Sequence, residues 1–74
     1  MEPEKAQRLI WNEMVEATGK FAAFNSVHEG YAVILEELDE LWDSIKSKES
    51  SNKEVEEEAI QVGAMALRFL IDCC

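Results

Sequence analysis

The side chains in this sequence that could do chemistry are mostly carboxylates, and they concentrate on one segment. Glu36, Glu37 and Glu40 stand within HEGYAVILEELDELWDSIK, residues 28–46, and Glu58 follows in a later segment. Carboxylate oxygens without accompanying His or Cys suit Mg²⁺ or Mn²⁺ rather than zinc. Glutamate is also an ordinary residue of exposed helix surfaces. These glutamates therefore have two interpretations, a solvated helix face or a site for divalent cations.

The charge of the chain limits its partners. Sixteen acidic residues outnumber seven basic ones, which gives a net charge of −9 and a pI near 4.4. Nucleic acids and anionic membranes are bound through clustered Lys and Arg, so we expect neither as a partner. A phosphate-bearing ligand would need a bound cation between itself and this acidic chain. No apolar run approaches the ~20 residues that span a bilayer, and no signal-peptide pattern is present, so we expect a cytoplasmic protein.

Helices must position these carboxylates, because apolar residues recur along the chain at intervals of three and four. The pattern predicts one helix over residues 4–18, a second over residues 26–46 and a third over residues 53–74. The polar segment 47–52 breaks the pattern and predicts a short antiparallel turn. The expected fold is all-α, a single domain over residues 1–74 in which an N-terminal helix precedes a helical hairpin.

The ends of the predicted helices carry signals of their own. Gly19 is expected to end the first helix, because glycine adopts the left-handed conformation that commonly follows a helix. The connector after it contains Phe21 and Phe24, which we expect to fill a gap between helices. Two pairs have the spacing of capping boxes, Ser26 with Glu29 and Ser51 with Glu54.

The apolar side chains exceed what one small chain can bury. Hydrophobic residues make up 47% of the sequence, and the third helix is apolar over most of its circumference. Soluble monomers rarely expose such a surface. We therefore expect a homodimer or tetramer in which the hairpins pair into a four-helix bundle. The second helix contributes a stripe expected to lie in the core: Val27, Tyr31, Ile34, Leu35, Leu38, Leu41, Trp42 and Ile45.

The acidic edge of the second helix should meet the third helix. Glu37 lies on the flank of the apolar stripe, and Glu40 lies one turn later on the same edge. The polar stripe of the third helix is acidic too, with Glu54, Glu57 and Glu58. Partly buried carboxylates need a counter-charge. Divalent cations held between the two helices would supply it.

Two short motifs support that interpretation through a family resemblance. EELDE, residues 36–40, has the form EExxE, and EAIQ, residues 58–61, follows at a suitable distance on the next helix. With the upstream HEG, the region from residue 26 to residue 72 resembles the MazG-like all-α nucleoside triphosphate pyrophosphohydrolases, in particular small phage- and prokaryote-type members. The resemblance implies Mg²⁺-dependent hydrolysis of an NTP or dNTP to a monophosphate and pyrophosphate.

The resemblance also implies a role for individual residues. Glu37 and Glu40 match metal ligands of EExxE, and Glu58 matches the first residue of the family's ExxD. Glu36 matches the glutamate that orients or deprotonates the attacking water. Gln61 stands where the family has Asp, so its amide oxygen can bind Mg²⁺ but adds no charge.

One further residue and an alternative function complete the expectations. Arg68 lies near the place where the family has a residue that contacts phosphate or sugar. The alternative function is a non-catalytic helical oligomer that binds metal, nucleotide or a protein partner without turnover. Gln61 and the short chain favour this alternative, because a weaker metal site would slow or abolish catalysis.

Overall fold

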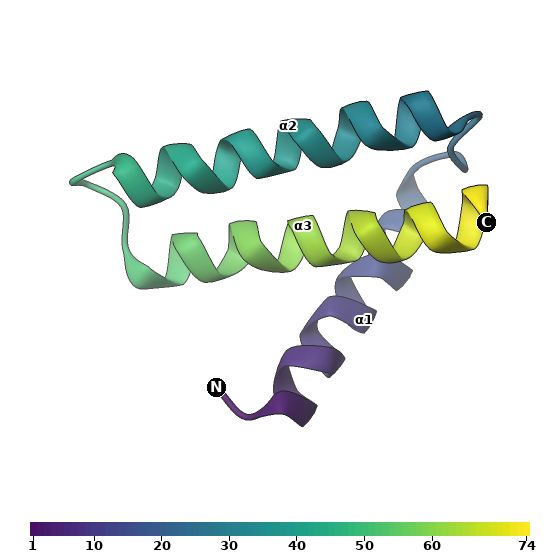
Figure 1. The fold of residues 1–74 in the computed structure, drawn as a ribbon. Helices are drawn as coiled ribbons and strands as arrows, with labels where there is room; N and C mark the ends of the chain where they lie inside the picture. Colours follow the sequence, from purple (N-terminus) through teal and green to yellow (C-terminus); the bar gives the residue numbers. More distant parts are fainter.

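The chain folds into three helices and no strand, which confirms the all-α prediction. The computed structural model describes residues 1–74, with α1 at Pro3–Lys20, α2 at Val27–Lys46 and α3 at Asn52–Cys73. α2 and α3 run antiparallel as a hairpin, while α1 crosses α3 and diverges from the hairpin towards the N-terminus (Figure 1). α1 contacts α3 and not α2. No helix is apolar enough over a sufficient length to cross a membrane.

Serine side chains begin the two helices of the hairpin, as the sequence predicts. The Ser26 hydroxyl accepts a hydrogen bond from the Glu29 backbone N–H at 3.1 Å, and the Ser51 hydroxyl accepts one from the Glu54 N–H at 3.2 Å. The Glu29 carboxylate also reaches back and accepts the backbone N–H of Asn25 at 3.3 Å. These bonds satisfy N–H groups that have no partner within a helix.

The end of α1 differs from the prediction that Gly19 terminates it. The helix continues through Gly19 to Lys20, and no glycine in the chain has a positive φ. Lys20 pairs with Glu16 one turn earlier at 3.0 Å, which supports the last turn. The helix ends because Phe21 adopts an extended backbone, φ −125° and ψ 147°, while its N–H still donates to the Ala17 carbonyl.

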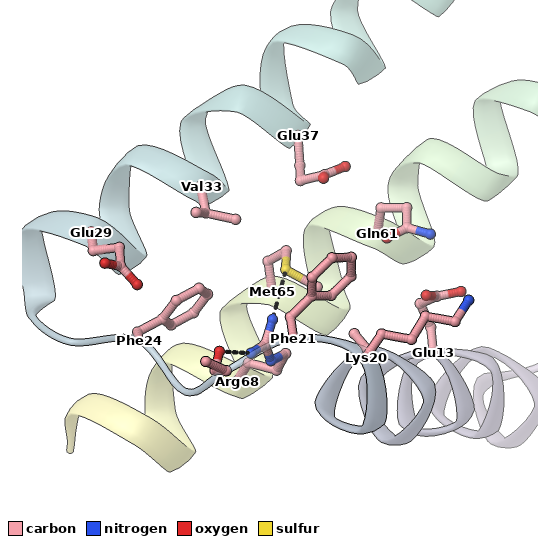
Figure 2. A pocket seen from close by; sticks show the side chains of 12 residues that line it. Glu13, Lys20, Phe21, Phe24, Glu29, Val33, Glu37, Gln61, Met65 and Arg68 are labelled. Carbon is pink, nitrogen blue, oxygen red and sulfur yellow. Dashed lines mark hydrogen bonds between the residues drawn. The ribbon is translucent and has the colours of Figure 1, made fainter.

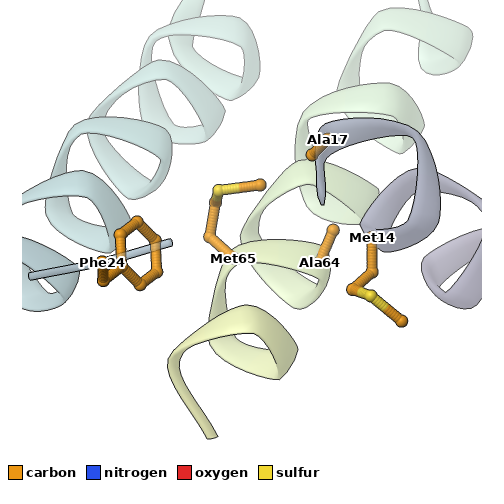
Figure 3. Close-up of a cluster of buried hydrophobic side chains, with 5 residues drawn as sticks. All are labelled: Met14, Ala17, Phe24, Ala64 and Met65. Atoms are coloured by element: carbon orange, nitrogen blue, oxygen red, sulfur yellow. The ribbon is translucent and has the colours of Figure 1, made fainter. Parts of the chain in front are cut away.

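The buried core is small and lies where α1, the connector and α3 meet. Met14 and Ala17 of α1, Phe24 of the connector, and Ala64 and Met65 of α3 form it (Figure 3). The core therefore lies towards one end of the hairpin.

Of the two phenylalanines in the connector, only one fills a gap between helices. Phe24 is buried in the core, as predicted, whereas Phe21 is 64% exposed. The prediction for Phe21 is wrong because the extended chain places it at the rim of a pocket (Figure 2).

Most of the apolar stripe of α2 lies outside the core of the single chain, and only Ile34 of the stripe packs against it. Of the other two helices, only α3 packs on α2, and Phe24 of the connector lies against its first turn. α2 presents Gly30, Val33 and Glu37 to that side, each buried or half-buried. Gly30 permits the close packing, since a Cβ there would clash with the ring of Phe69. Ile34 and Leu41 are half-buried at the seam. The other six residues of the stripe are exposed, Val27 among them. We call the five that follow it along α2 the outer stripe: Tyr31, Leu35, Leu38, Trp42 and Ile45.

Candidate metal centre

Three of the predicted metal ligands come together between α2 and α3. Glu37 and Glu40 stand on successive turns of α2, and Glu58 stands near the start of α3 across the hairpin. One carboxylate oxygen from each residue lies within 4.8 Å of the others. The short turn after Lys46 places Glu58 opposite Glu37 and Glu40, because it returns the chain directly alongside α2.

The three carboxylates repel one another, and no basic side chain offsets them. The pKa of Glu37 is raised above its ordinary value by burial first, and then by the negative charges of Glu40 and Glu58. The pKa of Glu58 is raised by burial and then by Glu40. The chain's two ion pairs, Lys20 with Glu16 and Lys46 with Asp43, involve none of the three glutamates.

One oxygen of this cluster has no partner. Glu58 Oε2 is buried and makes no hydrogen bond with the protein. An unpaired buried oxygen of a charged group is costly, so sites of this kind are usually completed by a donor, a water or a cation. Three converging carboxylates with one orphaned oxygen fit a hard divalent cation, which prefers such ligands.

The remaining predicted residues lie around this cluster in different ways. Gln61 is half-buried one turn after Glu58, and it lines a pocket together with Glu37 (Figure 2). Glu36 is exposed and does not belong to the group of three carboxylates. Its charge contributes to the raised pKa of Glu37, although less than burial, Glu40 and Glu58 do.

A pocket of about 530 Å³ adjoins the cluster. It lies between the C-terminal part of α1, the connector and the groove of the hairpin, with Glu37 and Gln61 on the wall nearest the three carboxylates (Figure 2). Val33, Met65 and Phe24 give it an apolar wall. Sequence reasoning missed its polar contributors from α1 and the start of α2, because only tertiary packing brings these elements to the groove: Glu13, Lys20 and Glu29.

Arg68 lines the same pocket at the end away from the carboxylates. The ten residues from Glu58 correspond to about 15 Å along the helix axis. The side chain is 4% exposed, and its Nη2 donates to the Ala22 carbonyl at 2.8 Å. Its guanidinium carbon lies 4.7 Å from the centre of the Phe24 ring. Arg68 therefore fixes the connector against α3, and its predicted contact with substrate stays a prediction.

A second bond from α3 fixes the connector, and sequence reasoning missed it. Asp72 accepts the Phe24 backbone N–H at 3.0 Å, across 48 residues of sequence. No local pattern marks a contact between residues so far apart in the chain.

The arrangement places three carboxylates beside a pocket large enough for a small organic ligand, and Glu37 belongs to both. Glu37, Glu40 and Glu58 supply the charge, and Gln61 stands beside them with an amide oxygen. Pockets that bind small molecules typically span about 300–1,000 Å³. No protein-family model, curated protein or solved structure matches the chain.

Proposed function

We propose that this protein is a Mg²⁺-dependent nucleoside triphosphate pyrophosphohydrolase of the MazG-like kind. It would convert an NTP or dNTP to the monophosphate and pyrophosphate. The observation that carries the proposal is the convergence of Glu37, Glu40 and Glu58 without a basic partner, together with the orphaned Oε2 of Glu58. A cation at this point would remove the repulsion and complete that oxygen.

The residues would divide the work as follows. Glu37, Glu40 and Glu58 hold Mg²⁺, or Mn²⁺ in its place, and Gln61 adds a neutral oxygen. The cation, when bound, neutralises the phosphates and lowers the pKa of water. Glu36, exposed beside Glu37, orients the attacking water or accepts its proton. Water then bonds to phosphorus as pyrophosphate leaves.

The adjoining pocket supports a nucleotide as the ligand. Glu37 and Gln61 belong to its lining as well as to the metal side, so phosphates held at the cation leave the nucleoside inside the pocket. Phe24 and Met65 offer apolar surface to it. The bound cation also explains how a chain with a net charge of −9 binds a polyanion.

The proposed activity is tested by pyrophosphate release. Purified protein is incubated with Mg²⁺ and each of the common NTPs and dNTPs, and pyrophosphate is measured. We expect release from at least one triphosphate and its loss in Glu40→Gln. Glu56→Gln is the matched control, because Glu56 is exposed on α3 outside the cluster and the charge change is the same. Absence of pyrophosphate from every triphosphate, with folded protein, would overturn the proposal.

The alternative proposal is a non-catalytic module that binds metal or nucleotide, or a protein partner. Two observations favour it: Gln61 contributes no charge, and Glu36 lies outside the group of three carboxylates. Calorimetric titration separates the two functions. Mg²⁺ binding that Glu37→Gln abolishes, without turnover of any triphosphate, would establish the module.

We also propose a homo-oligomer that works in the cytoplasm, independently of nucleic acid and membranes. A dimer or tetramer in which hairpins pair as a four-helix bundle would cover apolar side chains that the single chain exposes, such as Trp42 and Leu70. Static light scattering at micromolar concentration should report at least a dimer.

A further inference from the structure

The outer stripe of α2 forms a continuous apolar surface along one helix. Its five side chains are between 40% and 64% exposed, and they extend over residues 31–45, about 21 Å of helix. The stripe contains the large side chains Tyr31 and Trp42, the kind of residue that dominates the energetics of protein interfaces. α1 does not reach it, because α1 contacts only α3.

The accessible surface area of the chain is larger than that of a compact monomer of the same mass. The accessible surface is 5412 Å², whereas a compact monomer of 8.4 kDa has about 4,600 Å². The excess, about 800 Å², equals what each partner contributes to a standard-sized protein interface. One interface of ordinary size would therefore reduce the accessible area of the chain to that of a compact monomer.

The order of apolar residues in the stripe is symmetric about Leu38. A two-fold interface must be self-complementary, so that a residue before the axis meets one after it. Reading outward from Leu38, apolar side chains occur three, four and seven residues away in both directions. Of the antiparallel pairs about this centre, Tyr31 with Ile45 lies wholly in the outer stripe. Leu35 would meet Leu41, and Trp42 would meet Ile34, both of which are half-buried at the seam with α3.

Helix dipoles favour the antiparallel direction, because it sets the negative end of one α2 beside the positive end of the other.

We propose that a second copy of this chain docks antiparallel on the outer stripe, about a two-fold axis at Leu38. Glu37 and Glu40 point about 100° and 160° away from Leu38 around α2, so the interface leaves the carboxylates uncovered. This specifies the face and register of the proposed self-association, and it does not depend on the proposed activity.

Disulfide trapping tests the direction and the register. In a Cys73→Ser, Cys74→Ser background, we expect Leu38→Cys to cross-link with itself under mild oxidation. Tyr31→Cys should cross-link with Ile45→Cys when the two variants are mixed, and neither should do so alone. Ala32→Cys is the control, because Ala32 is exposed on another face of α2. Self-cross-linking of Tyr31→Cys alone would overturn the antiparallel register.

Light scattering of the unmodified chain tests whether a second copy of the chain covers the outer stripe. A dimer is expected, and Leu38→Glu should raise its dissociation constant at least about 30-fold, since a charge would be buried at the axis. Circular dichroism reports whether that variant keeps its helices. A monomer that persists at high micromolar concentration would overturn the proposal and assign the stripe to a different partner. None of these measurements involves nucleotide or metal, so failure here is distinguishable from failure of the proposed activity.

Discussion

The two ends of the hairpin groove hold opposite charges in different surroundings. At the turn end, Glu37, Glu40 and Glu58 converge without a counter-charge, and one oxygen has no partner. At the other end, Arg68 is more deeply buried, yet it is held by the Ala22 carbonyl and the Phe24 ring beside the core. The satisfied charge stabilises the fold. The unsatisfied cluster costs stability, which is the usual mark of a binding site.

Replacing Arg68 should have the largest effect on the free energy of unfolding. Arg68→Met keeps an apolar stem but loses the bond to Ala22 and the contact with Phe24, so we expect a loss of about 2–3 kcal/mol in the free energy of unfolding. Urea denaturation at fixed protein concentration measures it. Arg8→Met is the matched control, because Arg8 is exposed. Equal effects of the two substitutions would mean that Arg68 does not hold the connector.

Removing a charge from the cluster of Glu37, Glu40 and Glu58 should stabilise the protein rather than destabilise it. Glu58→Gln relieves repulsion and provides amide donors to Glu37 and Glu40, so the metal-free protein should gain up to about 1 kcal/mol. Mg²⁺ affinity, measured by calorimetry, should fall at least about tenfold, since a ligand is lost.

Both outcomes of Glu58→Gln are needed for the contrast between the two ends. A less stable protein would mean that Glu58 is structural. Unchanged Mg²⁺ affinity would place the cation elsewhere.

Adding a charge to the same cluster should sharpen the contrast further. Gln61→Asp adds a fourth acidic side chain to the three of the cluster, one turn after Glu58, so Mg²⁺ affinity should rise about three- to tenfold. The metal-free protein should become less stable because repulsion increases. An affinity equal to that of the parent chain would show that Gln61 does not face the cation.

The smallest effect concerns pH. The pKa values of Glu37 and Glu58 are raised above 4.5, so folding favours their protonated forms. Their stabilising contribution is complete below the unfolded pKa and is lost as pH rises through the folded pKa. Without Mg²⁺, the melting temperature should fall as pH rises above the ordinary carboxyl pKa of 4.5, and saturating Mg²⁺ should flatten this dependence. The same slope in Glu37→Gln, Glu58→Gln would assign it to other groups.

The sequence predicts the acidic end of the hairpin groove better than the end at Arg68. EELDE and EAIQ place Glu37, Glu40 and Glu58 on facing helices because helical spacing and a short turn suffice. The caps Ser26 and Ser51 are local as well. Local patterns do not contain the bond from Arg68 to Ala22, which joins residues 46 apart.

The face of α2 shows the same limit. Periodicity identifies an apolar stripe but not the element that covers it. It therefore predicts the stripe in the core, although α3 packs on the neighbouring side of α2. Phe21 and Phe24 are chemically identical, and only the path of the connector decides which of them is buried.

The way α1 is attached has a consequence for motion. α1 packs on α3 alone, and the two bonds that fix the following connector to α3 span 46 and 48 residues of chain. Because α1 packs on one helix only, it should join the hairpin late in folding and be the first element to detach from it. Since Glu13 and Lys20 of α1 form one wall of the pocket, detachment of α1 would open the pocket to solvent. Amide hydrogen exchange in α1 should therefore slow when a ligand occupies the pocket.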